Sequence, residues 1–168
     1  MAEDEQILEQ KMRSALRRLA KAVVVITCKH EGERYAMTAT AVSELSMDPP
    51  SLLICVNRAA SSASALATGV DYGVNILPTT HESIARRCAG GAARADRFLE
   101  GEWREAPGGT PYLEDAQAYF ICHQDGRMSY GTHEVIIGRV KCVGVAGLVD
   151  PLIYVDGRYT RLPDPPSD

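Results

Sequence analysis

Residues 35–64, YAMTATAVSELSMDPPSLLICVNRAASSAS, contain two predicted strands, a proline break between them and a cluster of small residues at the end. Residues 34–43 read as one strand, and its second half, residues 38–43, consists of short residues and hydroxyls. Pro49 and Pro50 interrupt the chain, because proline is excluded from central strand positions. The apolar strand 51–56 follows and leads to three serines. A stretch with so little side-chain bulk and so many backbone donors suits a surface on which a large flat ligand lies.

Short predicted strands continue on both sides of this stretch, at residues 23–28, 71–77, 116–124, 135–145, 151–155 and 158–162. Helical spacing occurs at residues 7–19, within a leading segment 5–20, and short helices are expected at 62–67 and 81–88. Residues 89–111 read as irregular, Asp125-Gly126-Arg127 as a turn, and the tail 163–168 as disordered. Many strands with few helices argue against alternating strand–helix units. We predict a mainly β, Greek-key-like antiparallel barrel with peripheral helices, in a single domain spanning residues 1–168.

Composition limits the class of protein. The 168 residues suffice for one domain, and 45% hydrophobic with 24% charged residues is ordinary for a globular chain. A formal net charge of −4 is not that of a nucleic-acid-binding domain. No apolar run approaches the roughly 20 residues that span a bilayer. The acidic start MAEDEQILEQK lacks the regions of a signal peptide. We therefore expect a cytoplasmic protein that binds neither nucleic acid nor membrane.

Metal and dithiol chemistry are not indicated by the cysteine and histidine pattern. The five cysteines are widely spread, form no C-x-x-C motif and mostly have apolar neighbours, so we expect buried, reduced thiols. The four histidines lack the spacing of metal ligands. The sequence also lacks a G-x-G-x-x-G dinucleotide motif, a phosphate loop, H-E-x-x-H and G-x-S-x-G. We predict no metal site.

Four local patterns each permit a ligand site and also an ordinary structural role. The small residues 38–43 suit either a tightly packed barrel strand or a ligand surface. Asn57 with the nearby serines forms either a serine-capped turn or an anion site at a helix start. His133 lies beside a redox ring or caps a strand. Arg97 and Phe98, in the long irregular segment, could meet an anion and an aromatic ring. Taken singly, none of these patterns distinguishes a ligand site from a structural role.

Taken in order, the segments resemble the short-chain flavin reductase family, the reductase components of two-component aromatic monooxygenases. The resemblance runs from about Met12 to Leu162. Its most specific part is TATAVSELSMDPPSLLICVN at residues 38–57, which is similar to the reductases of the 4-hydroxyphenylacetate and chlorophenol hydroxylases. Further matching pieces follow in the expected order: VNIL at 74–77, AG at 89–90, RF at 97–98, G-x-P-x-L at 109–113, GTH at 131–133, G-x-V at 138–140 and PLIY at 151–154.

The resemblance implies a flavin-binding split β-barrel and a set of ligand contacts. The residues it implies around the isoalloxazine ring are Thr38, Ala39, Thr40, Ala41, Val42 and Ser43. Those near the ribityl chain and phosphate are Cys55, Val56, Asn57, Ser61, Ser62 and Ser64. The turn and loop that would close over the rest of the flavin contribute Cys88, Ala89, Gly90, Arg97 and Phe98. On the nicotinamide side it implies His133, as the catalytic residue, together with Tyr154 and Arg13.

Two residues depart from the family pattern. Many relatives have aspartate where this chain has Thr132, so no carboxylate flanks His133 here. A phenylalanine is common where Cys88 stands. Neither change removes a group that hydride transfer requires, and both bear on the choice and release of flavin.

The resemblance implies NADH-dependent reduction of free FAD or FMN by direct hydride transfer, with release of reduced flavin to a partner aromatic-compound monooxygenase. It also implies a homodimer that builds the site from both chains. The residues are compatible with this reaction, because stacking two flat rings needs no strong general base. A flavin-binding electron carrier or storage module, which releases no reduced flavin, is the alternative. An oxidase of the pyridoxamine-phosphate type would call for more basic phosphate anchors than Ser61 and Ser62.

Overall fold

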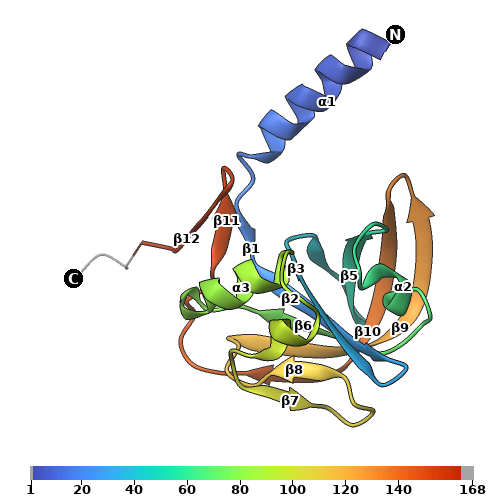
Figure 1. Cartoon of the computed structure of the whole chain (residues 1–168), viewed down its shortest axis with the longest axis vertical. Helices are drawn as coiled ribbons and strands as arrows, with labels where there is room; N and C mark the ends of the chain where they lie inside the picture. The colour runs from blue at the N-terminus through green and yellow to red at the C-terminus, as the bar shows by residue number, and fades with distance from the viewer. Residues whose placement is uncertain (1, 164–168) are drawn as a thin grey trace.

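The computed structural model describes residues 2–163 and places many more of them in strands than in helices (Figure 1). In chain order the elements are α1 (Ala2–Leu16), β1 (Lys21–Ala22), β2 (Val24–His30), β3 (Glu33–Ala39), β4 (Val42–Met47), β5 (Pro50–Asn57), α2 (Ala63–Leu66), β6 (Tyr72–Ile76), the 3₁₀ turn η1 (Thr79–His81), α3 (Glu82–Cys88), the 3₁₀ turn η2 (Ala95–Phe98), β7 (Trp103–Glu105), β8 (Pro111–Leu113), β9 (Ala118–Tyr130), β10 (His133–Val145), β11 (Ile153–Val155) and β12 (Arg158–Thr160).

Seven of these strands form one antiparallel sheet in the order β3-β2-β6-β9-β10-β5-β4. The two edge strands, β3 and β4, are consecutive in the chain and are separated by Thr40 and Ala41. An extended chain covers at most about 3.6 Å per residue, so the two edges of the sheet come within roughly 11 Å of each other at this point. The sheet therefore curls into a split barrel, and the predicted fold class is confirmed by the solved flavin reductase structure described below.

Strand β2 is buried on both faces and separates two hydrophobic clusters. Val24, Ile26 and Cys28 face a cluster inside the barrel with residues of β5, β6, β9, β10 and α2. Val23 and Val25 face a second cluster with residues of α3, β8 and the segment before β11. Alternation along a strand sends successive side chains to opposite faces, so β2 joins the two cores.

The predicted single strand 34–43 is wrong in one respect: the structure divides it into β3 and β4. β3 pairs with β2 and β4 pairs with β5, on opposite edges of the sheet. At the junction the carbonyl of Ala41 accepts a hydrogen bond from the Cys55 N–H at 2.9 Å. Pattern alone could not show this, because small residues and hydroxyls continue across the break. We call residues 39–42 the strand corner.

The predicted turn at Asp125-Gly126-Arg127 is also wrong, since these residues lie within β9. The register passes from Gly126 opposite Ile137 to Gln124 opposite Gly138, so Asp125 is the extra residue of a bulge. The chain turns instead at Gly131, whose φ is +53°, and at Thr132. Strand β10 accordingly begins at His133, two residues earlier than predicted.

The segment 89–111 is less irregular than predicted. It contains η2, β7 and the start of β8, and β7 pairs with β8 in a small two-stranded sheet. The remaining loops carry glycines with positive φ, including Gly90, Gly91 and Gly101. Apart from residue 163, which has no regular structure, the tail predicted to be disordered lies outside the described residues.

Helix α1 projects from the barrel (Figure 1). It ends at Leu16, earlier than predicted, because the carbonyl of Arg17 accepts a hydrogen bond from the Asp156 N–H at 2.8 Å and so leaves the helical ladder. Its large apolar side chains are exposed, with Leu8 at 67%, Met12 at 60% and both Ile7 and Leu16 at 44%. None of the helices in the described part of the chain is long and apolar enough to cross a bilayer.

Candidate functional site

The strand corner forms one wall of an apolar groove of about 530 Å³. Thr40, Val42 and Ser43 line this groove, as three of the residues predicted to surround a ring. The opposite wall comes from Val24, Leu52, Val74, Ile76 and Phe120, on β2, β5, β6 and β9. Volumes of 300–1,000 Å³ with mainly apolar walls are typical of small-molecule sites. The groove is thus suited to a flat aromatic ring.

The other residues near the corner are engaged with the fold. The Thr38 hydroxyl donates a hydrogen bond of 2.6 Å to the carbonyl of Ala85 on α3. Ala39 packs against the cluster inside the barrel, and the carbonyl of Ala41 is bonded to Cys55. Thr38 therefore fastens β3 to α3, and its predicted contact with a ring remains a prediction.

A second cleft, of about 290 Å³, adjoins the groove at the foot of α1. It brings together Arg13, Thr40 and Tyr154, three predicted site residues that are far apart in the sequence. The two cavities share Leu19, Lys21 and Thr40. One end of this combined site is apolar, and the other carries several basic side chains. We call the second cavity the basic cleft.

Arg17 holds the foot of α1 against the turn between β11 and β12. Its Nε donates to Oδ1 of Asp156 at 2.9 Å, and a second guanidinium nitrogen donates to the Asp156 carbonyl at 3.1 Å. This hydrogen bond and the positive charge lower the pKa of the Asp156 carboxyl below its ordinary value. Arg13 is paired within the helix with Glu9, at 2.5 Å. Both arginines of the cleft thus have carboxylate partners.

At the other end of β5, the structure brings Asn57 and His133 opposite each other. They are cross-strand partners in the β5–β10 ladder. The Thr132 Oγ1 lies 2.9 Å from Nδ1 of His133. Arg58 closes the arrangement: its N–H donates to the Thr132 carbonyl at 3.0 Å, and its guanidinium donates to the Gly131 carbonyl. Two motifs separated by about 75 residues in sequence thus lie together at one end of the barrel, where β5 ends and β10 begins.

The serine cluster is divided by its burial. Ser61 and Ser64 are exposed, whereas Ser62 is buried and its hydroxyl donates to the Met37 sulfur at 2.8 Å. Helix α2 has four residues and no side-chain cap. The phosphate role of these serines stays a prediction, and Ser61 and Ser64 are the members that present hydroxyls to solvent. Sequence reasoning gave no role to Arg58, the adjacent cation, although its position directly after Asn57 was a usable signal.

Nearer the cores, Val56 is fully buried and Cys55 is half-buried. Burial raises the pKa of the Cys88 thiol to about 11, and its sulfur lies 3.8 Å from the Arg97 carbonyl. The side chains of Val56 and Cys88 are buried, so their predicted contacts with a ligand, which no observation tests, would have to be made by the backbone.

Arg97 and Phe98 tie the long loop to β3. One guanidinium nitrogen of Arg97 donates to the Ala36 carbonyl at 2.7 Å. The Phe98 ring lies 4.4 Å from the Arg34 guanidinium carbon and 4.8 Å from the centroid of the Trp103 ring. Ahead of them, Ala89 and Gly90 are exposed in a turn where Gly90 has a φ of +142°. A ligand at this loop would thus first meet exposed backbone.

The described residues contain no group of three or more histidine, cysteine, aspartate or glutamate side chains able to hold a metal ion. The cavities offer apolar walls, hydroxyls and cations instead. Such a set suits binding and orientation of ring-shaped, anionic molecules, and the groove therefore fits a flavin ring on size and on the chemistry of its lining.

Comparison with known proteins supplies the family. Residues 16–163 match the model of the flavin reductase like domain. The chain is 41% identical over 154 residues to the FMN reductase (NADH) RutF of Methylorubrum extorquens, covering 92% of this chain and 75% of the relative. It is 36% identical over 152 residues to the reductase component of the FADH₂-dependent resorcinol hydroxylase of a Rhizobium species, covering 89% and 85%. A crystal structure of a flavin reductase domain protein from Arthrobacter superposes with a TM-score of 0.86 at 30% identity, covering 95% and 98%.

Proposed function

Because this chain belongs to the flavin reductase like family, we propose that it oxidises NADH and reduces FAD or FMN. The hydride passes directly between the two rings, and reduced flavin leaves for a separate aromatic-compound monooxygenase. The structural observation that carries the proposal is the junction at Thr40, where the apolar groove meets the basic cleft. Two ring-shaped, anionic molecules can be bound side by side there.

A flavin bound in the groove would supply an electrophilic ring able to accept a hydride from the dihydronicotinamide, with the accompanying proton coming from water. The protein has to orient the two rings and exclude wrong approaches. Val42 and Ser43 line one side of the groove, and Thr40 lies where the two rings would meet. His133 lies opposite Asn57 at the other end of β5, and its Nε2 has no hydrogen-bond partner among residues 2–163. We assign His133 the catalytic role and Tyr154 a contact on the nicotinamide side.

Release of reduced flavin is favoured by the kinds of contact available. The groove is lined mostly by apolar and small side chains, and Glu44 is its acidic member. Exposed hydroxyls of Ser61 and Ser64 and the guanidinium of Arg58 are the groups near the predicted phosphate position. Contacts of this kind hold a flavin moderately. The resorcinol hydroxylase reductase component among the relatives supports a monooxygenase partner.

The proposal is tested by following NADH absorbance with and without added FAD or FMN. We expect oxidation that depends on either flavin, and none with either would refute the activity. Under anaerobic conditions, reduced flavin should pass a filter that retains the protein. Complete retention would favour the electron carrier or storage module.

The role of His133 has its own experiment. His133→Ala should slow hydride transfer in single-turnover mixing more than it weakens flavin binding, because the ring contact matters most while the rings react. His30→Ala is the matched control, since His30 lies at the end of β2, beside the β2–β3 turn. Equal rates in wild type and His133→Ala would exclude the catalytic role.

We further propose a homodimer, supported by the exposed apolar face of α1. A helix of 15 residues is marginal in water on its own, so this face needs cover. The helix is acidic in its first half, with Glu5 and Glu9, and basic in its second half, with Lys11 and Arg13. An antiparallel pair of such helices from two copies opposes unlike charges and obeys two-fold symmetry. Light scattering should give twice the chain mass, and a monomer would refute the dimer.

The cytoplasm is the proposed location. All five cysteines are free, which suits a reducing compartment. Fractionation of the producing cells would test this.

A further inference from the structure

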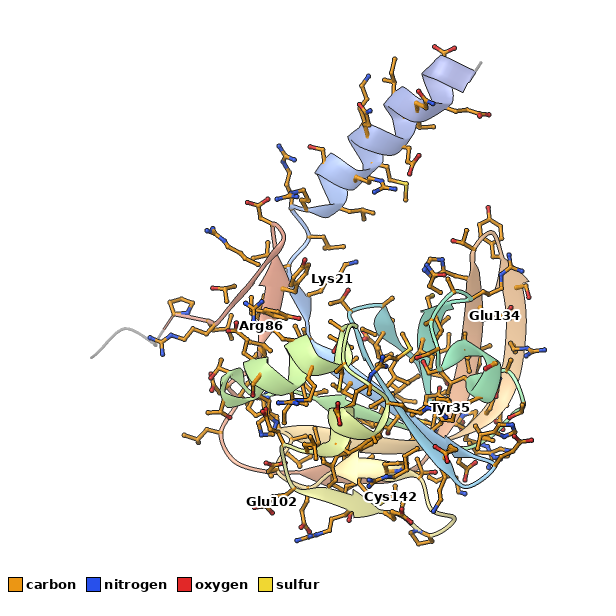
Figure 2. The ribbon with its side chains drawn as sticks, in the orientation of Figure 1. Lys21, Tyr35, Arg86, Glu102, Glu134 and Cys142 are labelled. Atoms are coloured by element: carbon orange, nitrogen blue, oxygen red, sulfur yellow. The ribbon has the colours of Figure 1, made fainter. Side chains whose placement is uncertain are left out.

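Lys21 carries the only charge among the three residues shared by the apolar groove and the basic cleft, the other two being Leu19 and Thr40. It lies at the foot of α1, at the start of the barrel (Figure 2). Strand β1 fixes its backbone, since Lys21 pairs with Tyr154 of β11. Lys21 is thus held in place by β11, the strand that carries Tyr154, a predicted nicotinamide contact.

The ammonium group of Lys21 has no hydrogen bond or ion pair with any described residue, 2–163. The neighbouring cations differ: Arg13 is paired with Glu9 and Arg17 with Asp156. Carboxylates therefore neutralise the two arginines. Lys21 is the cation of the basic cleft that has no carboxylate partner among the described residues, so its ammonium can bind an anion from a ligand. A half-buried lysine between an apolar groove and a polar cleft is suited to an anionic group of a ligand whose ring enters the groove.

The flavin phosphate is an unsuitable occupant for this position. Its predicted contacts, Ser61 and Ser62, follow the far end of β5, whereas Leu52 of the same strand lines the groove. Five residues of strand separate Leu52 from Asn57, roughly 17 Å. A flavin with its ring in the groove and its phosphate near Asn57 points away from Lys21. The remaining anion in the reaction is the pyrophosphate of the hydride donor.

We propose that Lys21 is a binding residue for the pyrophosphate of the nicotinamide dinucleotide. This inference rests on the proposed function and deepens it. The ammonium draws the pyrophosphate into the basic cleft and so delivers the dihydronicotinamide to the Thr40 junction. Lys21 acts on binding of the donor and takes no part in the transfer itself.

Steady-state kinetics with FMN as acceptor test the proposal, because FMN has no pyrophosphate. Lys21→Ala should raise the KM for NADH about tenfold, as loss of one charge-assisted contact does, with kcat reduced less than twofold. Lys21→Arg should restore most of the affinity. Lys141→Ala is the matched control: it removes a lysine of β10 that lines neither cavity and pairs with Asp71, and it should leave both constants unchanged.

A truncated donor isolates the pyrophosphate. N-benzyl-1,4-dihydronicotinamide has the reacting ring and no phosphate, so wild type and Lys21→Ala should use it at rates within twofold. An unchanged KM for NADH would overturn the proposal, as would an equal loss with both donors, which would indicate a contact with the ring. A rise in the KM for FAD without a rise for NADH would assign Lys21 to the flavin instead. Failure of wild type to oxidise NADH would refute the proposed function itself and is seen before any variant is made.

Discussion

Gly138 on β10 lies against the ring of Tyr72, which is fully buried. A Cβ added at Gly138 would lie 2.0 Å from the Tyr72 hydroxyl oxygen, 2.6 Å from Cζ and 2.9 Å from the Cβ of Cys122. Carbon atoms in protein cores normally remain about 3.5 Å or more from such neighbours, so the overlap with the hydroxyl exceeds 1 Å. Because the ring is enclosed by the core, the strain cannot be relieved by a simple rotation. We expect Gly138→Ala to destabilise the fold by about 3 kcal/mol.

The nearest clashing atom can be removed by a second substitution. Within the described part of the chain the Tyr72 hydroxyl has no well-formed hydrogen bond, and the Cys122 thiol beside it is a weak partner. Tyr72→Phe alone should therefore change the free energy of unfolding by less than about 1 kcal/mol. In the Gly138→Ala background the same change should restore about 1 kcal/mol or more, a coupling that neighbouring residues show and distant ones do not.

Urea unfolding followed by the fluorescence of Trp103 measures all four members of this cycle. Gly126→Ala is the control on the paired strand β9, because its Cβ would meet Ile137 at 3.6 Å, an ordinary contact. This control should stay within about 1 kcal/mol of wild type. If Gly138→Ala is equally mild, or if its effect and that of Tyr72→Phe add within about 0.5 kcal/mol, the steric explanation is refuted.

Three further predictions concern the site and the thiols. Ser61→Ala should raise the KM for FMN several-fold with little effect on stability, whereas Ser62→Ala should lower the unfolding midpoint, since its hydroxyl is buried and bonds to the Met37 sulfur; the reverse pattern would refute this division. Thr132→Asp places a carboxylate beside Nδ1 of His133 and favours the imidazolium, so the pH profile of flavin reduction should move to higher pH, while Thr132→Val, matched in size, should produce no such shift. Iodoacetamide at pH 8 should alkylate the exposed Cys142 first. Burial raises the pKa values of the three buried thiols to between about 11 and 12, and these thiols stay protonated until the pH approaches those values. Mass spectrometry of peptides identifies the order of labelling, and early labelling of a buried thiol would contradict the prediction.

The sequence predicted the barrel because the strands are short, apolar and separated by turn residues. The errors occurred where local pattern and pairing differ. Asp125-Gly126 looks like a hairpin turn, yet the pairing of β9 with β10 continues through it by means of a bulge. Residues 34–43 look like one strand, yet their two halves pair on opposite edges of the sheet. Pairing partners lie far away in sequence, so composition over a short window does not contain this information.

The sequence predicted which segments carry the candidate site, but it could not predict which of their side chains are exposed and which are buried. Ser61 and Ser62 are adjacent in sequence, and one is exposed while the other is buried against Met37. Lys21 has no motif around it, and the role proposed for it depends on its position where two cavities meet, without an ion-pair partner among residues 2–163. Burial and ion pairing depend on tertiary packing. Because residues adjacent in sequence can have different packing surroundings, a local pattern does not predict them.

The strand corner explains why the site lies where it does. In a closed barrel every strand has two hydrogen-bonded neighbours, whereas β3 and β4 each have one neighbour in the seven-stranded sheet. Their outer edges keep backbone donors and acceptors that no strand satisfies, and exposed edges of this kind are normally covered. At Thr40 this unpaired backbone borders an apolar groove, so a flat ligand with polar groups at its rim can bond to the edge and bury its ring in one step. A ligand of that kind satisfies the edge where the barrel fails to close, and the small residues at the corner leave the space for it.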